Sequence, residues 1–359
     1  MESFSQILDS YRQQIDREIN LYADQIRRST KERFGTDARL VIDAFFDLLT
    51  RGGKRMRGSL AITGYQMCGG TDVQMITRAA MAIEMVQSAL LVMDDIQDRS
   101  EMRRGKPTVH KLLEAECQKM GLGGDAAHTG ISLALNAMLA GQHSALMVVD
   151  GLNVDAERRA KAMSIISQTF VVTVHGQTAD ILNECRDNVD EAAIDRVMDW
   201  KTAYYSVLNP LCVGMVLAGA GCEDTDAIRD YAIHTGKAFQ ITDDIVGIFG
   251  DQAKTGKNPM DDVREGKKTL LAVYALAHAT ADDAAFLRQQ LGNPRLTKAH
   301  FLRCRTILES SGAREYAEKR AGECVQAAVG ALQNAPADWK KDKIAFLCSL
   351  VEHMKSRYA

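Results

Sequence analysis

The chain has 359 residues, of which 46% are hydrophobic and only 6% aromatic, and its formal charge is −3. This charge balance argues against nucleic acid as a partner, because nucleic-acid-binding domains are usually basic. Apolar residues recur at three- and four-residue spacings, and alternating β-branched residues are scarce, so we predict an all-α protein. No linker or low-complexity tract interrupts the pattern, and we expect one domain over residues 1–359.

The cysteines and the apolar stretches predict where the protein resides. Eight cysteines stand singly, without the paired spacing of zinc sites, which in a chain of this length indicates reduced thiols and a cytoplasmic protein. The N-terminus has no signal-peptide pattern. The longest apolar stretch, residues 207–221, is broken by Pro210 and by glycines and is too short to cross a bilayer. We therefore expect a soluble protein with no transmembrane segment.

Helices are expected to follow one another with short breaks. The first two cover residues 2–30 and 38–50, and the two glycines of the basic segment at 51–57 open a third, which runs to about Met67. The fourth runs from Thr71 or Asp72, either of which can cap it, to the acids at 94–98. A loop containing Pro107 follows. Further helices are expected near 109–119, 125–150, 154–184, 190–219 and 225–249, with about four smaller ones after a loop at 250–268.

The fourth helix ends in three acids. Asp94 and Asp98 are four residues apart and share a helix face, with Asp95 about 100° round. A hard divalent cation would relieve their repulsion, and Mg²⁺ typically takes one or two carboxylates and phosphate oxygens. Arg103 and Arg104 follow closely, where they would hold a phosphate. The pattern indicates a diphosphate site, although a single acid cluster is more often a solvated helix face.

A second acidic pair, Asp243 and Asp244, lies in the helix expected at 225–249. The loop after it contains Lys257 and Lys267, so acids on a helix are again followed by positive charge. Two such arrangements in one chain are hard to explain as coincidence, and the second one strengthens the interpretation of the first.

Other polar residues have two readings each. Lys54 and Arg57 lie near a helix N-terminus, where backbone N–H groups favour anions, but such a segment is more often a solvated turn. Gln177 and Asp180 lie in an otherwise apolar helix, so they are either satisfied core residues or the lining of a polar cavity. Lys201 and its neighbour Thr202 could equally form a surface pair.

In their order and spacing these motifs resemble the trans-polyprenyl diphosphate synthases, which elongate isoprenoid chains. The resemblance covers roughly residues 40–280. The matching segments are GGKRMR at 52–57, DDIQD at 94–98, RRGKPT at 103–108, GQTAD at 176–180, KT at 201–202, FQITDD at 239–244, GK at 256–257 and EGKKT at 265–269.

The resemblance implies an isoprenoid synthase-type helical bundle around a deep central cavity, with the two acidic helices facing each other across its mouth. It implies Mg-dependent head-to-tail (1′–4) condensation of isopentenyl diphosphate with an allylic prenyl diphosphate, by a homodimer. Metal ions and arginines would stabilise the departing diphosphate, and an apolar cavity would protect the carbocation from water.

The resemblance also assigns roles by position. The implied ligands of Mg²⁺, or of Mn²⁺ in its place, are Asp94, Asp98 and Asp243. The implied clamps on the allylic diphosphate are Arg103, Lys201, Lys257 and Lys267. The implied isopentenyl diphosphate site comprises Lys54, Arg57, Gln87 and Arg104. The residues around the reacting centre are Gln177, Asp180, Thr202 and Gln240, and Asp95 and Asp244 complete the catalytic set.

Three departures from the family pattern are present. Gly247 replaces the last aspartate of the second acidic motif, and Gly58 stands where proline is usual. The glycine-aspartate pair usual on the helix after the first site is not evident at residues 133–138. None of these changes removes a residue expected to act in the reaction, so we expect activity to survive.

Product length is predicted from the helix that carries Asp94. A large aromatic residue commonly blocks the chain five residues before the first aspartate in synthases that stop at fifteen carbons. Here that residue is Ala89, and Val86 and Met85 lie deeper, about 5 Å per turn. This favours geranylgeranyl diphosphate (C20), with farnesyl (C15) or longer (C25–C40) products as alternatives.

Two other function classes stay open. A class I terpene cyclase also uses an aspartate-rich motif, but the Asn/Asp-Ser/Thr-Glu pattern of its second metal site is absent around Asp243. A non-catalytic subunit of a heteromeric synthase tends to lose the first aspartate motif, which this chain keeps.

Overall fold

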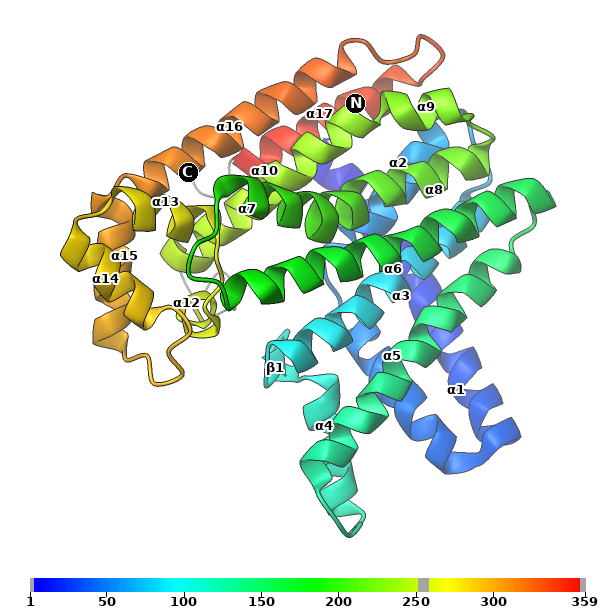
Figure 1. Cartoon of the computed structure of the whole chain (residues 1–359). Helices are drawn as coiled ribbons and strands as arrows, with labels where there is room; N and C mark the ends of the chain where they lie inside the picture. The colour runs from blue at the N-terminus through cyan, green and yellow to red at the C-terminus, as the bar shows by residue number, and fades with distance from the viewer. Residues whose placement is uncertain (1–2, 251–257, 356–359) are drawn as a thin grey trace. The chain divides into compact units, whose positions relative to one another are not determined.

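The computed structural model describes residues 3–250 and 258–355, and most of this part is helical (Figure 1). Its one described sheet is a pair of two-residue strands, so the predicted all-α class is confirmed. Contacts between Cα atoms divide the chain into two compact units. The first is Met1–Ser167 with Pro210–Gly221, and the second is Gln168–Asn209 with Cys222–Ala359. A single domain over the whole chain stays a prediction.

The first unit contains α1 (Phe4–Thr50), α2 (Met56–Met67), α3 (Val73–Gln97), α4 (Val109–Lys119) and α5 (Ala126–Asp150). Helix α6 (Ala156–Glu184) begins in it, and nearly all of α8 (Asn209–Ala218) lies in it. The break expected between two N-terminal helices is a kink in α1 at Gly35, whose φ is 86°. Where the sequence predicted only a loop before α4, a hairpin pairs β1 (Met102–Arg103) with β2 (Lys106–Pro107).

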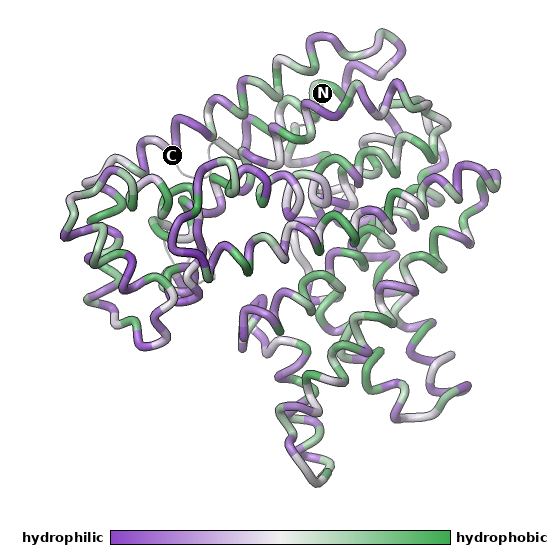
Figure 2. Tube along the Cα trace, in the orientation of Figure 1, coloured by the Kyte–Doolittle hydropathy of each residue, from purple (hydrophilic) through white to green (hydrophobic). Residues whose placement is uncertain are grey.

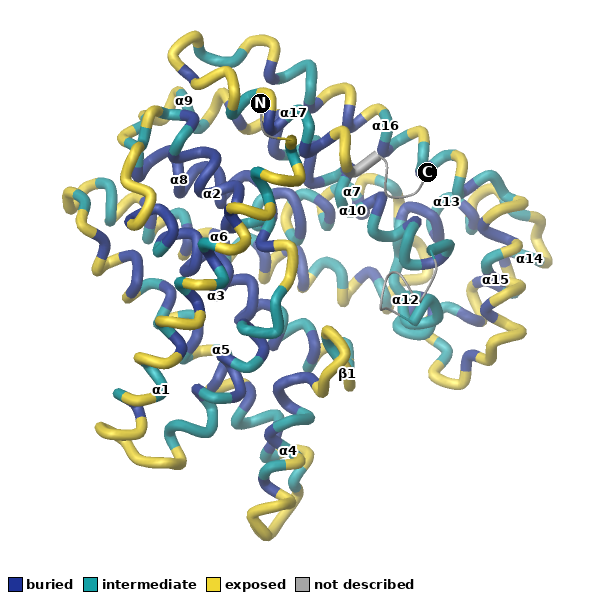
Figure 3. The backbone as a smooth tube through the Cα atoms, turned by 180° about the vertical axis from the view of Figure 1, so that it is seen from behind, coloured by how far each residue is buried: buried dark blue, intermediate teal, exposed yellow. Residues whose placement is uncertain are grey.

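Helix α3 is the core helix of the first unit. It packs against α1, α2 and α5, and Figure 3 shows most of its length as buried. Every residue from 79 to 90 is buried, and apart from Glu84 and Gln87 these side chains are small or apolar around the whole helix. By length and composition both α3 and α5 could cross a membrane, but the most apolar window of α3 is 89% buried inside the fold. That burial is typical of a core helix in a globular protein.

The second unit is built around α10 (Arg229–Phe249), which packs against η1 (Met198–Leu208) and α16 (Ala313–Leu332). Its other described helices are α7 (Glu191–Val197), α9 (Cys222–Ala227), α12 (Asp261–Glu265), α13 (Leu270–His278), α14 (Ala281–Gln290), α15 (Lys298–Ser310) and α17 (Lys341–Lys355).

The helix expected over residues 190–219 is present but is not α-helical throughout. The segment consists of α7, then η1 with π-helical hydrogen bonding, then α8. The return to α-helix lies between Leu208 and Asn209, next to Pro210, which has no N–H to donate. π-Helical turns often occur at functional sites, and η1 carries Lys201 and Thr202.

Candidate active site

The first acidic cluster closes the C-terminal end of α3. Asp98 caps the helix, and its N–H donates to the carbonyl of Asp94 at 2.8 Å, so these two acids are one turn apart as predicted. Asp95 is 0% exposed, and its Oδ1 accepts a hydrogen bond from Arg103 Nε at 2.6 Å. Burial raises the pKa of Asp95 to about 6, although the charge of Arg103 opposes the rise.

The hairpin after α3 directs two consecutive arginines to different neighbours. Arg103 contacts Asp95 and also lies 3.3 Å from Asp94, through Nη2 and Oδ2. Arg104, whose φ is 55°, donates instead to the carbonyl oxygens of Leu48 and Gly52. Burial and the nearby positive charge of Arg55 lower the pKa of Arg104. The side chains of Arg103 and Arg104 therefore belong to two different surroundings, as two separate anion sites would require.

The glycine-led segment before α2 is fixed by its own Arg55. Arg55 is buried, and its Nε lies 2.7 Å from Asp16 Oδ1, with Nη1 3.5 Å from Glu84 Oε2. The N–H of Gly58 donates to Glu84 Oε1 at 2.9 Å. A proline at position 58 could not make this bond. The buried Glu84 thus explains why this position is not the usual proline.

The flanking residues Lys54 and Arg57 are more accessible than Arg55. Lys54 is exposed and Arg57 half-buried. On α3, Gln87 is 8% exposed, and its Oε1 is buried without a hydrogen-bond partner among the described residues. A buried amide oxygen with no partner is rare in protein interiors, so Gln87 fits a site that a ligand completes. The predicted chain-length residues Ala89, Val86 and Met85 are buried in the same helix.

The second unit brings five predicted residues into contact. Lys201 Nζ lies 2.6 Å from Asp180 Oδ2, which joins η1 to α6. Thr202 Oγ1 donates to Gln240 Oε1 at 2.7 Å, and Gln240 Nε2 donates to Asp244 Oδ1 at 2.7 Å. Gln177, on the α6 segment that carries Asp180, is 4% exposed. Lys201 and Thr202 therefore each hydrogen-bond to another helix and do not form a surface pair.

Two glycines permit this clustering. A Cβ at Gly176 would lie 2.4 Å from the backbone N of Lys201, and one at Gly236 would lie 2.4 Å from the Cβ of Ala203. Any side chain at either position would push η1 away from α6 or α10. The close approach of these backbones sets the positions of Lys201 and Thr202.

The second acidic motif has an unexpected neighbour. A Cβ at Gly247 would lie 2.8 Å from Oδ2 of Asp262, so a carboxylate from α12 lies beside the position where the family motif usually ends in aspartate. No local pattern in the sequence connects Gly247 with Asp262. Lys267 pairs with Glu265 at 3.0 Å. The predicted clamp Lys257 lies outside the described residues.

Within the described residues, no group of three or more His, Cys, Asp or Glu side chains is gathered to hold a metal ion. Mg²⁺ usually keeps several waters and takes only one or two carboxylates with phosphate oxygens. Asp94 and Asp98 lie one turn apart, near a buried Asp95 Oδ2 that has no hydrogen-bond partner among the described residues. This oxygen-rich helix end fits a Mg²⁺ ion that binds together with a diphosphate. Asp243 belongs to the second unit, and its meeting with Asp94 across a cavity stays a prediction.

Comparison with known proteins gives consistent matches. The family described as Polyprenyl synthetase matches residues 39–308. A geranylgeranyl diphosphate synthase of Saccharolobus solfataricus is 31% identical over 322 residues, covering 90% of this chain and 91% of its own. A geranylfarnesyl diphosphate synthase of Aeropyrum pernix is 33% identical over 297 residues, covering 82% and 87%. The crystal structure of geranylgeranyl pyrophosphate synthase from Corynebacterium glutamicum, complexed with isoprenyl diphosphate and magnesium, has a TM-score of 0.91 at 28% identity, covering 98% and 99%.

Proposed function

Because the chain belongs to the polyprenyl synthetase family and is a trans-prenyl diphosphate synthase, we propose that it makes geranylgeranyl diphosphate from isopentenyl diphosphate and a shorter allylic diphosphate. The product length is inferred from the small, buried Ala89, which lies five residues before Asp94 in α3. Farnesyl and C25–C40 diphosphates are the alternative products.

We assign the ionisation step to Arg103, Lys201 and Lys267. These residues hold the diphosphate of the allylic substrate and stabilise its charge as the C–O bond breaks. Asp94, Asp98 and Asp243 would hold Mg²⁺, which would supply additional positive charge to this leaving group. Mn²⁺ is the alternative ion.

Isopentenyl diphosphate is assigned to a second anion site. Lys54, Arg57 and Arg104 bind its phosphates, and Gln87 offers a buried amide beside them. The C=C bond attacks the carbocation, and the proton lost from the new chain passes to the departing diphosphate. Apolar surroundings exclude water that would otherwise capture the cation.

The hydrogen-bonded cluster of the second unit is assigned to positioning the reacting groups. Thr202, Gln240 and Asp244 restrain one another, and Asp180 restrains Lys201. Groups held before the substrate arrives need little rearrangement in the transition state.

Chain elongation can be tested with labelled isopentenyl diphosphate and an allylic primer, with Mg²⁺ or with excess EDTA. We expect an elongated diphosphate that forms only when the metal is present. A hydrocarbon product would instead identify a terpene cyclase, and no product at all would identify a non-catalytic subunit. Equal rates in EDTA would contradict the metal assignment.

We propose that the protein is a homodimer. Helix α5 carries hydrophobic residues along its length (Figure 2) and exposes Leu135 and Leu139, one turn apart. Helix α6 exposes Val171, Val174 and Leu182 at helical spacing. Exposed apolar stripes of this kind commonly mark contacts between subunits. Light scattering should give twice the chain mass of 39.5 kDa, and Leu139→Glu should lower that mass.

A cytoplasmic location is proposed from the thiols. None of the eight cysteines, all of which lie in the described residues, forms a disulfide, which suits a reducing compartment.

A further inference from the structure

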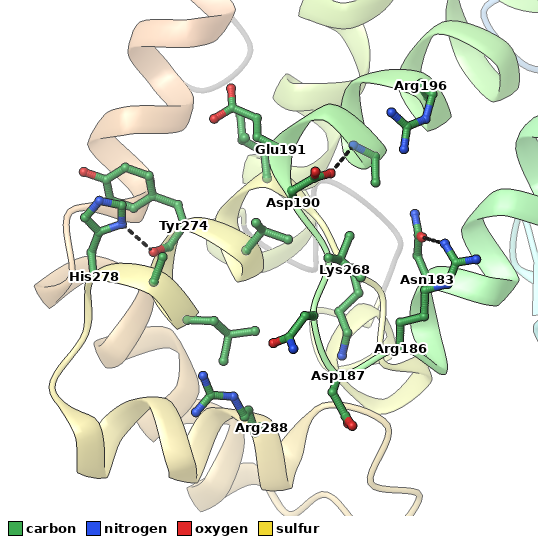
Figure 4. A pocket seen from close by; sticks show the side chains of 17 residues that line it. Asn183, Arg186, Asp187, Asp190, Glu191, Arg196, Lys268, Tyr274, His278 and Arg288 are labelled. Carbon is green, nitrogen blue, oxygen red and sulfur yellow. Dashed lines mark hydrogen bonds between the residues drawn. The ribbon is translucent and has the colours of Figure 1, made fainter.

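The second unit contains a pocket of about 740 Å³ that none of the assigned reaction residues lines. It lies among the C-terminal end of α6, α7, α13 and α14 (Figure 4). Ligand pockets for small molecules commonly have volumes of about 300–1,000 Å³. The pocket is therefore large enough for a small organic molecule.

Four cations line this pocket: Arg186, Arg196, Lys268 and Arg288. They come from three parts of the chain, and Figure 4 shows Lys268 extending into the middle of the pocket. Within the part of the chain that the structure describes, none of the four forms an ion pair; Arg186 donates only to the amide oxygen of Asn183, at 3.3 Å. Lys268 lies within electrostatic range of Asp187 and Glu184, but none of the four cations is neutralised in a close ion pair among the described residues, which favours an anion between them.

Two of the three acidic residues that line the pocket already interact with groups other than the four cations. Asp190 caps α7 by accepting from the N–H of Ala193 at 2.8 Å. Glu191 accepts from the hydroxyl of Tyr316 at 2.7 Å and pairs with Arg320 at 3.4 Å. The third, Asp187, is exposed. Four cations face these three acids in the lining, so the lining carries a net positive charge.

One buried amide group of the pocket also lacks a hydrogen-bond partner. Asn183 is 2% exposed, and its Nδ2 has no hydrogen-bond partner among the described residues. Burial lowers the pKa of Lys268, although the charge of Asp187 opposes this. An anion bound here would accept from the Asn183 amide and would favour the charged form of Lys268.

We propose that this pocket binds a diphosphate group. Arginine forks match phosphate oxygens in pairs, and three arginines surround one lysine here. Leu270, Val273 and Leu276 add an apolar wall, which suits an apolar chain attached to the diphosphate. The choice of sources rests on the proposed function: the reaction releases inorganic diphosphate and forms a prenyl diphosphate, and either carries the required group.

The test is calorimetric titration of the full-length protein in EDTA, which removes the metal that the active site needs. The probes are inorganic pyrophosphate and geranylgeranyl diphosphate. We expect the double variant Arg186→Gln/Arg288→Gln to raise Kd about tenfold or more for the probe that binds. Lys268→Gln is a second variant, in case the double variant does not fold.

The matched control is Arg295→Gln/Lys298→Gln, which removes two exposed cations of the same unit outside the pocket. It should bind like the wild type, and the pocket variants should retain normal elongation rates at saturating substrates. Tighter binding of geranylgeranyl diphosphate identifies the prenyl product as the source, and equal or tighter binding of pyrophosphate identifies the released anion. Binding unaffected by the pocket substitutions, or no binding of either probe to the wild type in EDTA, would overturn the proposal. If the wild type does not elongate prenyl diphosphates at all, the proposed function would be refuted instead.

Discussion

The ammonium nitrogen of Lys201 lies 2.6 Å from Oδ2 of Asp180, across the contact between η1 and α6. Both side chains remain partly exposed, at 23% and 15%, so a ligand can still reach the lysine. Gly176 allows this contact, because a side chain there would collide with the backbone of Lys201. The positive charge is therefore held in place before a diphosphate arrives.

Removing this charge should slow ionisation. We expect Lys201→Ala to lower kcat by about 10²–10³-fold, in the range for loss of one preorganised group that stabilises developing charge. Lys201→Arg should retain part of the rate. Asp180→Asn should have a smaller effect, because the ammonium remains but is less restrained. Steady-state kinetics with saturating substrates measure all three, and an unchanged kcat in Lys201→Ala would exclude the lysine from the reaction.

Substitutions in the two anion sites should change different kinetic constants. Lys54→Ala and Arg57→Ala should raise KM for isopentenyl diphosphate more than for the allylic substrate. Arg103→Ala, which removes the contacts to Asp94 and Asp95, should mainly lower kcat. If Lys54→Ala raises only the allylic KM, the two sites have been assigned in reverse.

Gly58 should not tolerate the proline usual in the family. Gly58→Pro removes the hydrogen bond to the buried Glu84 and should lower the free energy of unfolding by about 1–3 kcal/mol relative to Gly58→Ala. The alanine variant is the control, because it adds the same Cβ, 2.8 Å from Ile15 Cδ1, but keeps the N–H. Equal denaturation midpoints for the two variants would show that the hydrogen bond contributes nothing.

Restoring the usual aspartate at position 247 should disturb the second motif. The new Cβ would lie 2.8 Å from Asp262 Oδ2, and a second carboxylate would repel the first. We expect Gly247→Asp to lower the thermal midpoint, and Asp262→Ala to recover part of the loss in the double variant. Melting curves of the two singles and the double measure this coupling. Additive effects would mean that positions 247 and 262 do not interact.

Local patterns in the sequence predicted much of the first cluster. A four-residue spacing places Asp98 one turn beyond Asp94 wherever the helix forms, and Gly35 marked the break in α1. Helix periodicity could not predict the π-helical η1, because its hydrogen bonding depends on packing against α6 and α10 and on Pro210.

Contacts between segments that are distant in the sequence could not be predicted from local sequence patterns. Asp180 and Lys201 were both candidates, but their pairing depends on how two helices cross. Glu84 and Asp262 gave no signal of their own. In retrospect the glycines at 58 and 247, which depart from the family pattern, marked the places where those carboxylates lie.

The most direct test of the account is the product chain length of the wild type and Ala89→Phe. Both proteins would be incubated with isopentenyl diphosphate and an allylic primer, and the dephosphorylated products would be separated by chromatography. The buried Ala89 predicts geranylgeraniol from the wild type and farnesol from Ala89→Phe, because the ring would block the wall about one turn below Asp94. The same product distribution from both proteins would contradict the claim that this face of α3 sets the length.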